Sequence, residues 1–148
     1  MPSPTAVSRS RKTAKVLALA MAMALVLSSC FTPQQNEVAN RINTSRTARN
    51  LRPMGQNLEL TRKAQAWAEH LARTGRLEHS NLSSGISYRW RALGENVGVG
   101  SSIRSVHTSY MRSPGHRANI LSNKFNYVGT GHATRGGRVY TVQVFMQY

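Results

Sequence analysis

The feature that most constrains the fold is the C-terminal stretch over residues 139–148, which is apolar on both of its sides. Successive side chains of a β-strand point to opposite faces of the sheet. Because both faces are largely apolar, we expect helices to cover the sheet on both sides. One face carries Tyr140, Val142, Val144 and Met146, and the other carries Val139, Thr141, Gln143 and Phe145.

A second strand is expected over residues 125–134, immediately before this one. The two are joined around Gly136-Gly137, and such a pair tolerates the positive φ angles of a tight hairpin turn. A shorter strand is expected over residues 94–100, where Glu95, Val97 and Val99 alternate with smaller or polar residues. The strands therefore form a small antiparallel sheet.

The clearest helix covers residues 58–74, where apolar side chains recur at helical spacing and Gly75 suits a left-handed C-cap. Further helices are expected over 36–50, 87–93 and 103–112, and from Pro114 onward with Ser113 as N-cap. In the first of these, Arg41, Arg46 and Arg49 are expected to face solvent. Together the patterns predict an α+β fold, a three-layer α–β–α sandwich with a small antiparallel sheet.

The N-terminus has the pattern of an export signal. Basic residues precede an unbroken apolar run from Val16 to Leu27, which is too short to span a bilayer but suits a signal peptide. The run ends in Leu27-Ser28-Ser29-Cys30, which resembles the bacterial lipobox, and Cys30 is the only cysteine. We expect a signal peptide over 1–29, lipidation of Cys30, a tether over 30–35 and a folded domain over 36–148. An ordinary cleavable signal beside an incidental cysteine is the alternative.

The charge of the chain points to anionic partners. Its 20 Lys and Arg outweigh five Glu and no Asp, for a formal charge of +15. Removing residues 1–29 leaves a formal charge of +11. Such a charge favours phospholipid headgroups or anionic wall polymers, whereas export and the absence of basic clusters interleaved with aromatics argue against nucleic acid. The alternative is a solvated basic surface that aids solubility.

Three short motifs carry the polar residues most suited to chemistry. They are His79-Ser80, Gly94-Glu95-Asn96 and the segment from Pro114 to Leu121, which contains His116. Imidazole and carboxylate together form a ligand set for a divalent metal. His116 falls in the first turn of its helix, where the helix dipole disfavours the protonated ring.

The order and spacing of these motifs resemble the CAP superfamily of cysteine-rich secretory, antigen 5 and pathogenesis-related proteins, especially its compact bacterial branch. The likeness extends from about Asn36 to Tyr148. It implies the same α–β–α sandwich and a central cleft of two His and two Glu, in which the two His can bind Zn²⁺. By this resemblance His79 and His116 are the metal ligands and Glu95 is the first carboxylate.

The second family carboxylate has no counterpart here. Its place falls within residues 110–113, which read Tyr-Met-Arg-Ser. A metal held by two neutral imidazoles then lacks a second carboxylate to act as base or balancing charge. This departure argues against tight zinc binding and against hydrolysis.

Each candidate also has an ordinary structural interpretation. His79 and His116 either face a cleft or bond to nearby backbone. Glu95 either orients one of these imidazoles or caps a neighbouring backbone, and the two roles are compatible. We expect Ser80 and Asn96 to hold the cleft loops, and we treat the remaining histidines as structural or surface residues (His70, His107 and His132). A Ser–His hydrolase built on Ser80 or Ser113 is disfavoured because no Asp and no Gly-x-Ser-x-Gly elbow are present.

These observations lead to one function, one rival and a third interpretation, a wall-adhesive protein that binds through its basic surface without either cleft histidine. We expect an exported protein, lipid-anchored to the outside of the bacterial membrane, that binds a divalent metal, a lipid or an anionic envelope component through its cleft. The cleft residues are His79, Ser80, Glu95, Asn96 and His116. The rival is a weak zinc-dependent hydrolase of a peptide or envelope polymer, in which Glu95 would be catalytic. The sequence leaves the ligand and the oligomeric state open.

Overall fold

The structure, a computed structural model, describes residues 30–148, so the expected signal peptide over 1–29 lies outside it. Within the described residues, four helices and four strands follow one another along the chain. No helix among them is long and apolar enough to cross a membrane. In order, they are α2 (Pro33–Thr47), β1 (Gly55–Gln56), α3 (Leu58–Thr74), β2 (Ala92–Gly100), α4 (Ile103–Arg112), α5 (Pro114–Leu121), β3 (Tyr127–Arg135) and β4 (Arg138–Gln147).

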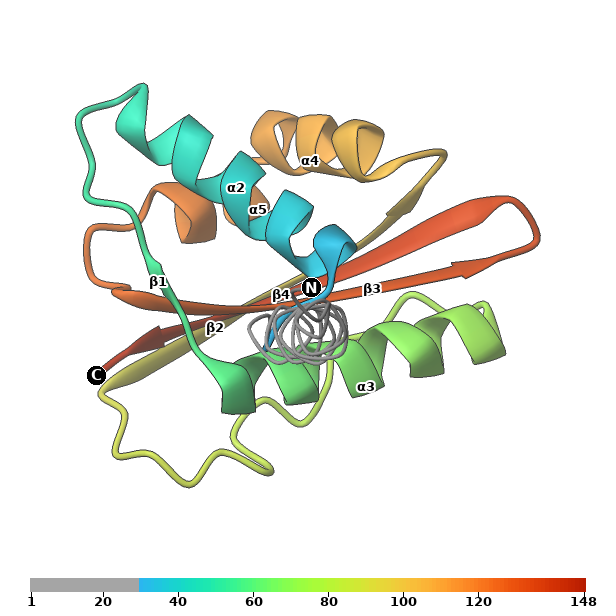
Figure 1. Ribbon diagram of the computed structural model, residues 1–148, viewed down its shortest axis with the longest axis horizontal. Helices are drawn as coiled ribbons and strands as arrows, with labels where there is room; N and C mark the ends of the chain where they lie inside the picture. The colour runs from blue at the N-terminus through green and yellow to red at the C-terminus, as the bar shows by residue number, and fades with distance from the viewer. Residues whose placement is uncertain (1–29) are drawn as a thin grey trace, which may run out of the picture. The chain divides into compact units, whose positions relative to one another are not determined.

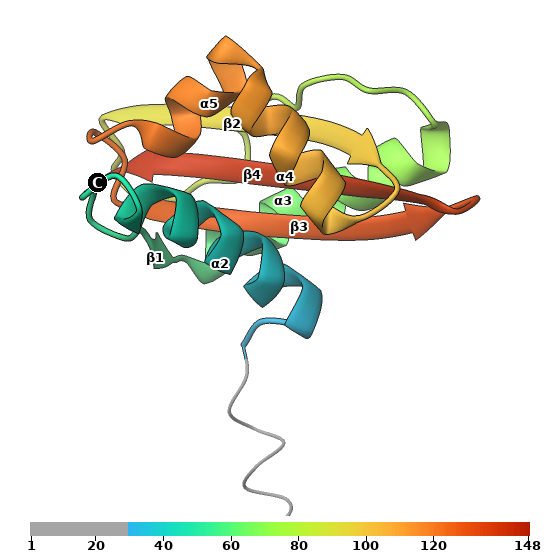
Figure 2. The same cartoon turned by 90° about the horizontal axis from the view of Figure 1, so that it is seen from above.

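The domain over residues 31–148 has three layers, as the two-sided apolar strand predicts. The strands lie in the order β1-β3-β4-β2, with β2, β4 and β3 antiparallel and the two-residue β1 parallel to β3. Helices α2, α4 and α5 cover one face of the sheet, and α3 covers the other (Figures 1 and 2). The α–β–α sandwich is therefore confirmed, and the parallel strand β1 is an addition to the expected antiparallel sheet.

Strand β4 forms the centre of two separate cores. Val142, Val144 and Met146 pack with α3 on one face, while Phe145 packs with α2, α4 and α5 on the other. The hairpin turn forms at Gly136 and Gly137, which both have positive φ. Burial on both faces explains why the alternation of polar and apolar residues is weak along this strand.

Helix α3 packs unusually close to β3 because two glycines leave room for its backbone. A Cβ atom added at Gly129 would lie 2.1 Å from the Leu60 carbonyl carbon, and one added at Gly131 would lie 2.1 Å from the Ala64 carbonyl oxygen. Both clashes are with backbone, so a side chain at either position requires the helix to move away.

Three local expectations were wrong. Helix α2 begins at Pro33 rather than Asn36, because Thr32 and Gln35 form a capping box that allows proline at the first helical position. Arg46 is 2% exposed rather than solvent-facing, and its guanidinium donates to the carbonyl groups of Arg52, Ile120 and Ser122. Residues 87–91 are not helical, and β2 begins directly after them.

Candidate functional site

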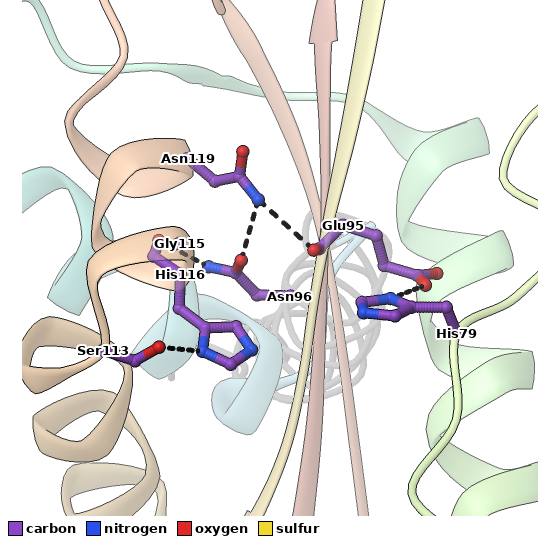
Figure 3. Close-up of a pocket in the computed structure, with 7 residues that line it drawn as sticks. All are labelled: His79, Glu95, Asn96, Ser113, Gly115, His116 and Asn119. Carbon is purple, nitrogen blue, oxygen red and sulfur yellow. Dashed lines mark hydrogen bonds and ion pairs between the residues drawn. The ribbon is translucent and has the colours of Figure 1, made fainter.

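The candidate site lies on both sides of the edge strand β2. Glu95 and Asn96 are consecutive on this strand, so their side chains point to opposite faces of the sheet. Figure 3 shows His79 and Glu95 on one side of β2, and Asn96, His116 and Asn119 on the other. A pocket of about 270 Å³ is lined by residues from both sides, namely His79, Glu95, Asn96, Ser113, Gly115, His116 and Asn119.

Glu95 holds the His79 side of the pocket through three hydrogen bonds. Its carboxylate accepts from His79 Nδ1 at 2.8 Å, from the Ser80 backbone N–H at 2.9 Å and from the Ser80 hydroxyl at 2.6 Å. The Glu95 side chain is 3% exposed, whereas that of His79 is 63% exposed. Glu95 therefore both orients an imidazole and fixes the backbone of the segment that carries it.

This geometry sets the tautomer of His79. A carboxylate is only an acceptor, so Nδ1 carries a proton, and in the neutral ring the lone pair lies on Nε2. Hydrogen bonding of the distal ring nitrogen to a carboxylate is the usual support of a metal-ligating histidine. The exposed ring thus presents a fixed lone pair to the pocket.

Ser113 plays the corresponding part for His116. It is the residue before α5, yet its hydroxyl makes no capping bond and lies 2.8 Å from His116 Nδ1 instead. The two residues are three apart, the spacing at which side chains in the first turn of a helix meet. Ser113 therefore supports His116 within residues 110–113, where the resemblance implies a carboxylate.

The environment of His116 favours the neutral form of its ring. Burial lowers its pKa below the ordinary histidine value, and the nearby His79 lowers it further. The ring also lies against Tyr110, with a distance of 5.0 Å between ring centroids. A neutral imidazole is the form that binds metals.

Asn96 and Asn119 lock α5 onto β2. The Asn96 amide donates to the His116 carbonyl at 3.1 Å and to Gln143 at 3.0 Å, and its oxygen accepts from Asn119 at 2.9 Å. Asn96 is fully buried. Asn96 therefore bonds the first turn of α5 to β2, and the expectation that it holds a cleft loop rather than reacts stays a prediction.

Of the predicted site residues, the structure brings His79, Glu95, Asn96 and His116 to one pocket, with Ser80 bonded to Glu95 behind it. Cys30 is an exposed free thiol outside the 31–148 domain. Sequence reasoning missed the supporting roles of Ser113 and Asn119. Their spacing of three residues on either side of His116 was the available clue.

The donor set fits a weak metal site rather than a closed structural one. Two imidazoles supply two of the four positions that Zn²⁺ prefers, leaving the others to water or a ligand. Among residues 30–148, no group of three or more His, Cys, Asp or Glu side chains is placed to hold a metal ion. Any ion at this site would therefore keep open positions for water or a ligand.

Comparisons with known proteins agree with this architecture. The profile of the cysteine-rich secretory protein family (CAP) matches residues 39–147. The Bacillus subtilis protein YkwD is 27% identical over 126 residues, an alignment that covers 78% of this chain and 48% of YkwD. The chain thus spans about half the length of that relative.

Two solved structures share the fold. An extracellular protein containing an SCP domain from Bacillus anthracis superposes with a TM-score of 0.68 at 18% identity, covering 82% of this chain and 45% of that one. An outer surface protein from Borrelia burgdorferi gives a TM-score of 0.66 at 17% identity, covering 77% of this chain and 92% of that one. At such identities the likeness establishes the fold alone.

Proposed function

This chain belongs to the cysteine-rich secretory protein (CAP) family, and on that premise we propose that it is an exported, membrane-tethered binding module. Its cleft presents two imidazole Nε2 atoms to a divalent ion whose remaining positions accept an anionic group of an envelope component. The observation that carries this proposal is the pairing of each Nδ1 atom with a protein partner, Glu95 for His79 and Ser113 for His116.

The size and charge of the site support a small anionic ligand. A pocket of about 270 Å³ lies below the range of pockets that enclose drug-sized molecules, so it suits an ion with a carboxylate or phosphate group better than a whole lipid. The formal charge of +11 over residues 30–148 adds long-range attraction for anions. A lipid then engages this site through its headgroup.

Export and tethering are supported by the leader pattern and by the relatives. Residues 1–30 combine a basic start, a short apolar run and a lipobox-like end. The two solved structures come from proteins described as extracellular and as an outer surface protein. Lipidation of Cys30 would leave the domain on the outside of the membrane.

Binding is favoured over the rival zinc-dependent hydrolase because the carboxylate that lines the cleft is already engaged. The Glu95 carboxylate is buried and accepts three hydrogen bonds, so it is not available to activate water. A hydrolase would show turnover that Glu95→Gln abolishes while ligand affinity is retained. The binding module shows no turnover with the native residue.

The decisive measurement is a calorimetric zinc titration of residues 31–148 at neutral pH, beside His79→Ala and His116→Ala. We expect one ion per chain, lost in both variants, with His70→Ala as a matched control because His70 lies outside the pocket. Unchanged zinc binding in both cleft variants, or none in the native domain, would refute the proposal.

A further inference from the structure

We propose that the domain lies on an anionic membrane surface through a patch at the end of the sheet where β2 and β3 begin. This aromatic patch consists of Leu58, Tyr88, Trp90 and Tyr148, with Arg89 and Arg91 beside them. The proposal rests on the membrane tethering proposed above, but it concerns a surface separate from the cleft.

Tyr148 contacts Tyr88 within the patch and Tyr127, a half-buried residue at the start of β3, beside it. Tyr148 lies edge-on to Tyr88, with ring centroids 6.3 Å apart, and edge-on to Tyr127 at 6.4 Å. Tyr148 is 61% exposed and Tyr88 46% exposed, although each is a large apolar side chain. Tyr88 and Tyr148 therefore form one exposed surface rather than two scattered residues.

The segment 87–91 supplies the charged part of the patch. All five of its residues are exposed. The expectation that no basic residues are interleaved with aromatics was wrong here, because the segment alternates the two in the order Tyr88, Arg89, Trp90, Arg91. The Arg91 backbone N–H donates to the Gln147 carbonyl at 2.8 Å, which fixes this segment beside the end of β4. Leu58, the first residue of α3, lies at the same end of the sheet. The backbone N–H of the preceding residue, Asn57, donates to the Val128 carbonyl near the start of β3 and holds it there.

This composition fits the interface of a bilayer. Tyrosine and tryptophan are enriched at the headgroup level, where their rings contact apolar chains and their polar atoms contact water. Arginine adds attraction to anionic headgroups. Within residues 30–148, five large hydrophobic side chains are exposed, and only Leu77 of these lies away from the patch, beyond the far end of α3.

The short connection to Cys30 favours the membrane as the partner. Helix α2 begins at Pro33, so only Phe31 and Thr32 separate it from Cys30, a reach of about 10 Å. A domain anchored so closely must rest on the headgroups. The first turn of α2 is bonded to the middle of β3 through Gln35 and Thr130 at 2.9 Å, about 10 Å along the strand from Tyr127.

Vesicle flotation of residues 31–148 tests the proposal, because the structure places the whole sheet and both cores within this range. The probe is a vesicle of equal parts phosphatidylglycerol and phosphatidylcholine. We expect the native domain to float and the triple variant Tyr88→Ser/Trp90→Ser/Tyr148→Ser to lose about tenfold or more in binding. Leu77→Ser, the matched exposed apolar residue, should bind as the native domain does.

A second pair of variants isolates the arginines. Arg89→Gln/Arg91→Gln should weaken flotation clearly more than Arg104→Gln/Arg138→Gln, which removes the same charge from exposed sites elsewhere. Circular dichroism and the melting temperature confirm that each variant is folded.

The proposal would be overturned if both arginine double variants lost the same amount of vesicle binding. It would also be overturned if the triple aromatic variant bound vesicles as well as Leu77→Ser does. Patch-dependent dimerisation without flotation, or patch-dependent binding to soluble polyphosphate without flotation, would overturn it too, since these point to a second copy or a wall polymer. The zinc titration reads the cleft independently, so failure here leaves the cleft function standing.

Discussion

The two sides of β2 hold equivalent imidazoles by different chemistry. His79 is held by a buried carboxylate, and His116 is held by a serine hydroxyl at the same distance of 2.8 Å. Both partners bond to Nδ1 and leave Nε2 facing the pocket (Figure 3), but only the carboxylate requires Nδ1 to carry the proton. A hydrogen bond to an ionised group is roughly twice as strong as a neutral one, so orientation is firmer on the Glu95 side.

The two imidazole rings also differ in the charge of their surroundings. Glu95 places a negative charge beside His79, with the Lys63 ammonium as the nearby cation that interacts with it. His116 bonds to an uncharged hydroxyl instead, and its pKa is lowered by burial and by His79. The cleft is therefore an asymmetric pair in which one imidazole is paired with a charge and the other is kept neutral by its surroundings.

Removing the charge of Glu95 should have the largest effect on zinc binding and on stability. We expect Glu95→Gln to weaken zinc binding by about 10- to 100-fold, because the amide no longer fixes the His79 tautomer. It should also lower the free energy of unfolding by about 2 kcal/mol, because hydrogen bonds to a buried charge are lost. Calorimetry and urea unfolding measure the two quantities.

The matched control is Glu78→Gln. Glu78 also pairs with a histidine, His70 at 3.2 Å, but its side chain is 49% exposed. An exposed pair of this kind contributes at most about 1 kcal/mol. If Glu78→Gln and Glu95→Gln changed zinc affinity equally, the asymmetry would be unrelated to the site.

Adding a charge to the neutral side should sharpen the comparison in the opposite direction. Ser113→Asp places a carboxylate where the hydroxyl supports His116, so the pKa of His116 should rise and zinc affinity should increase by about tenfold. Ser101→Asp, at an exposed position before α4, adds the same charge away from the pocket. An equal gain in both variants would show a general charge effect rather than support of His116.

Much of the fold could be predicted because its determinants are local. The period of apolar residues placed α3 and β4 correctly, and the glycine pair placed the hairpin turn. The predictions failed where contacts with distant parts of the chain determine whether a residue is buried. Arg46 resembles a surface residue by its helical position, but it is buried because three carbonyl groups from two other segments accept its hydrogen bonds.

The candidate site was predictable in its motifs but not in its supports. The motifs suggested a shared cleft in which Glu95 orients one of the two imidazoles, yet no pattern indicated that this imidazole is His79 or that Ser113 supports His116. Ser113 is the N-cap residue of α5, as expected, but its hydroxyl bonds to the imidazole of His116 instead of to the helix backbone. Whether a side chain bonds to one nearby partner or to another depends on where the fold places both partners.

The smallest expected effect comes from removing the neutral support. Ser113→Ala should weaken zinc binding only a few-fold, because the hydrogen bond from Ser113 to His116 is uncharged and partly exposed to water.

In the Ser113→Ala variant the pKa of His116 should stay below the ordinary value of 6.5, since burial and His79 cause its shift. His79→Ala, in contrast, should raise that pKa. Because the folded-state pKa lies below that of the unfolded chain, the neutral ring contributes stability that is present above about pH 6.5 and is lost as the pH falls. NMR titration of the His116 ring protons in both variants measures the shifts, and a pKa that moves with Ser113→Ala but not with His79→Ala would show that the hydroxyl, not the second imidazole, sets the charge of this ring.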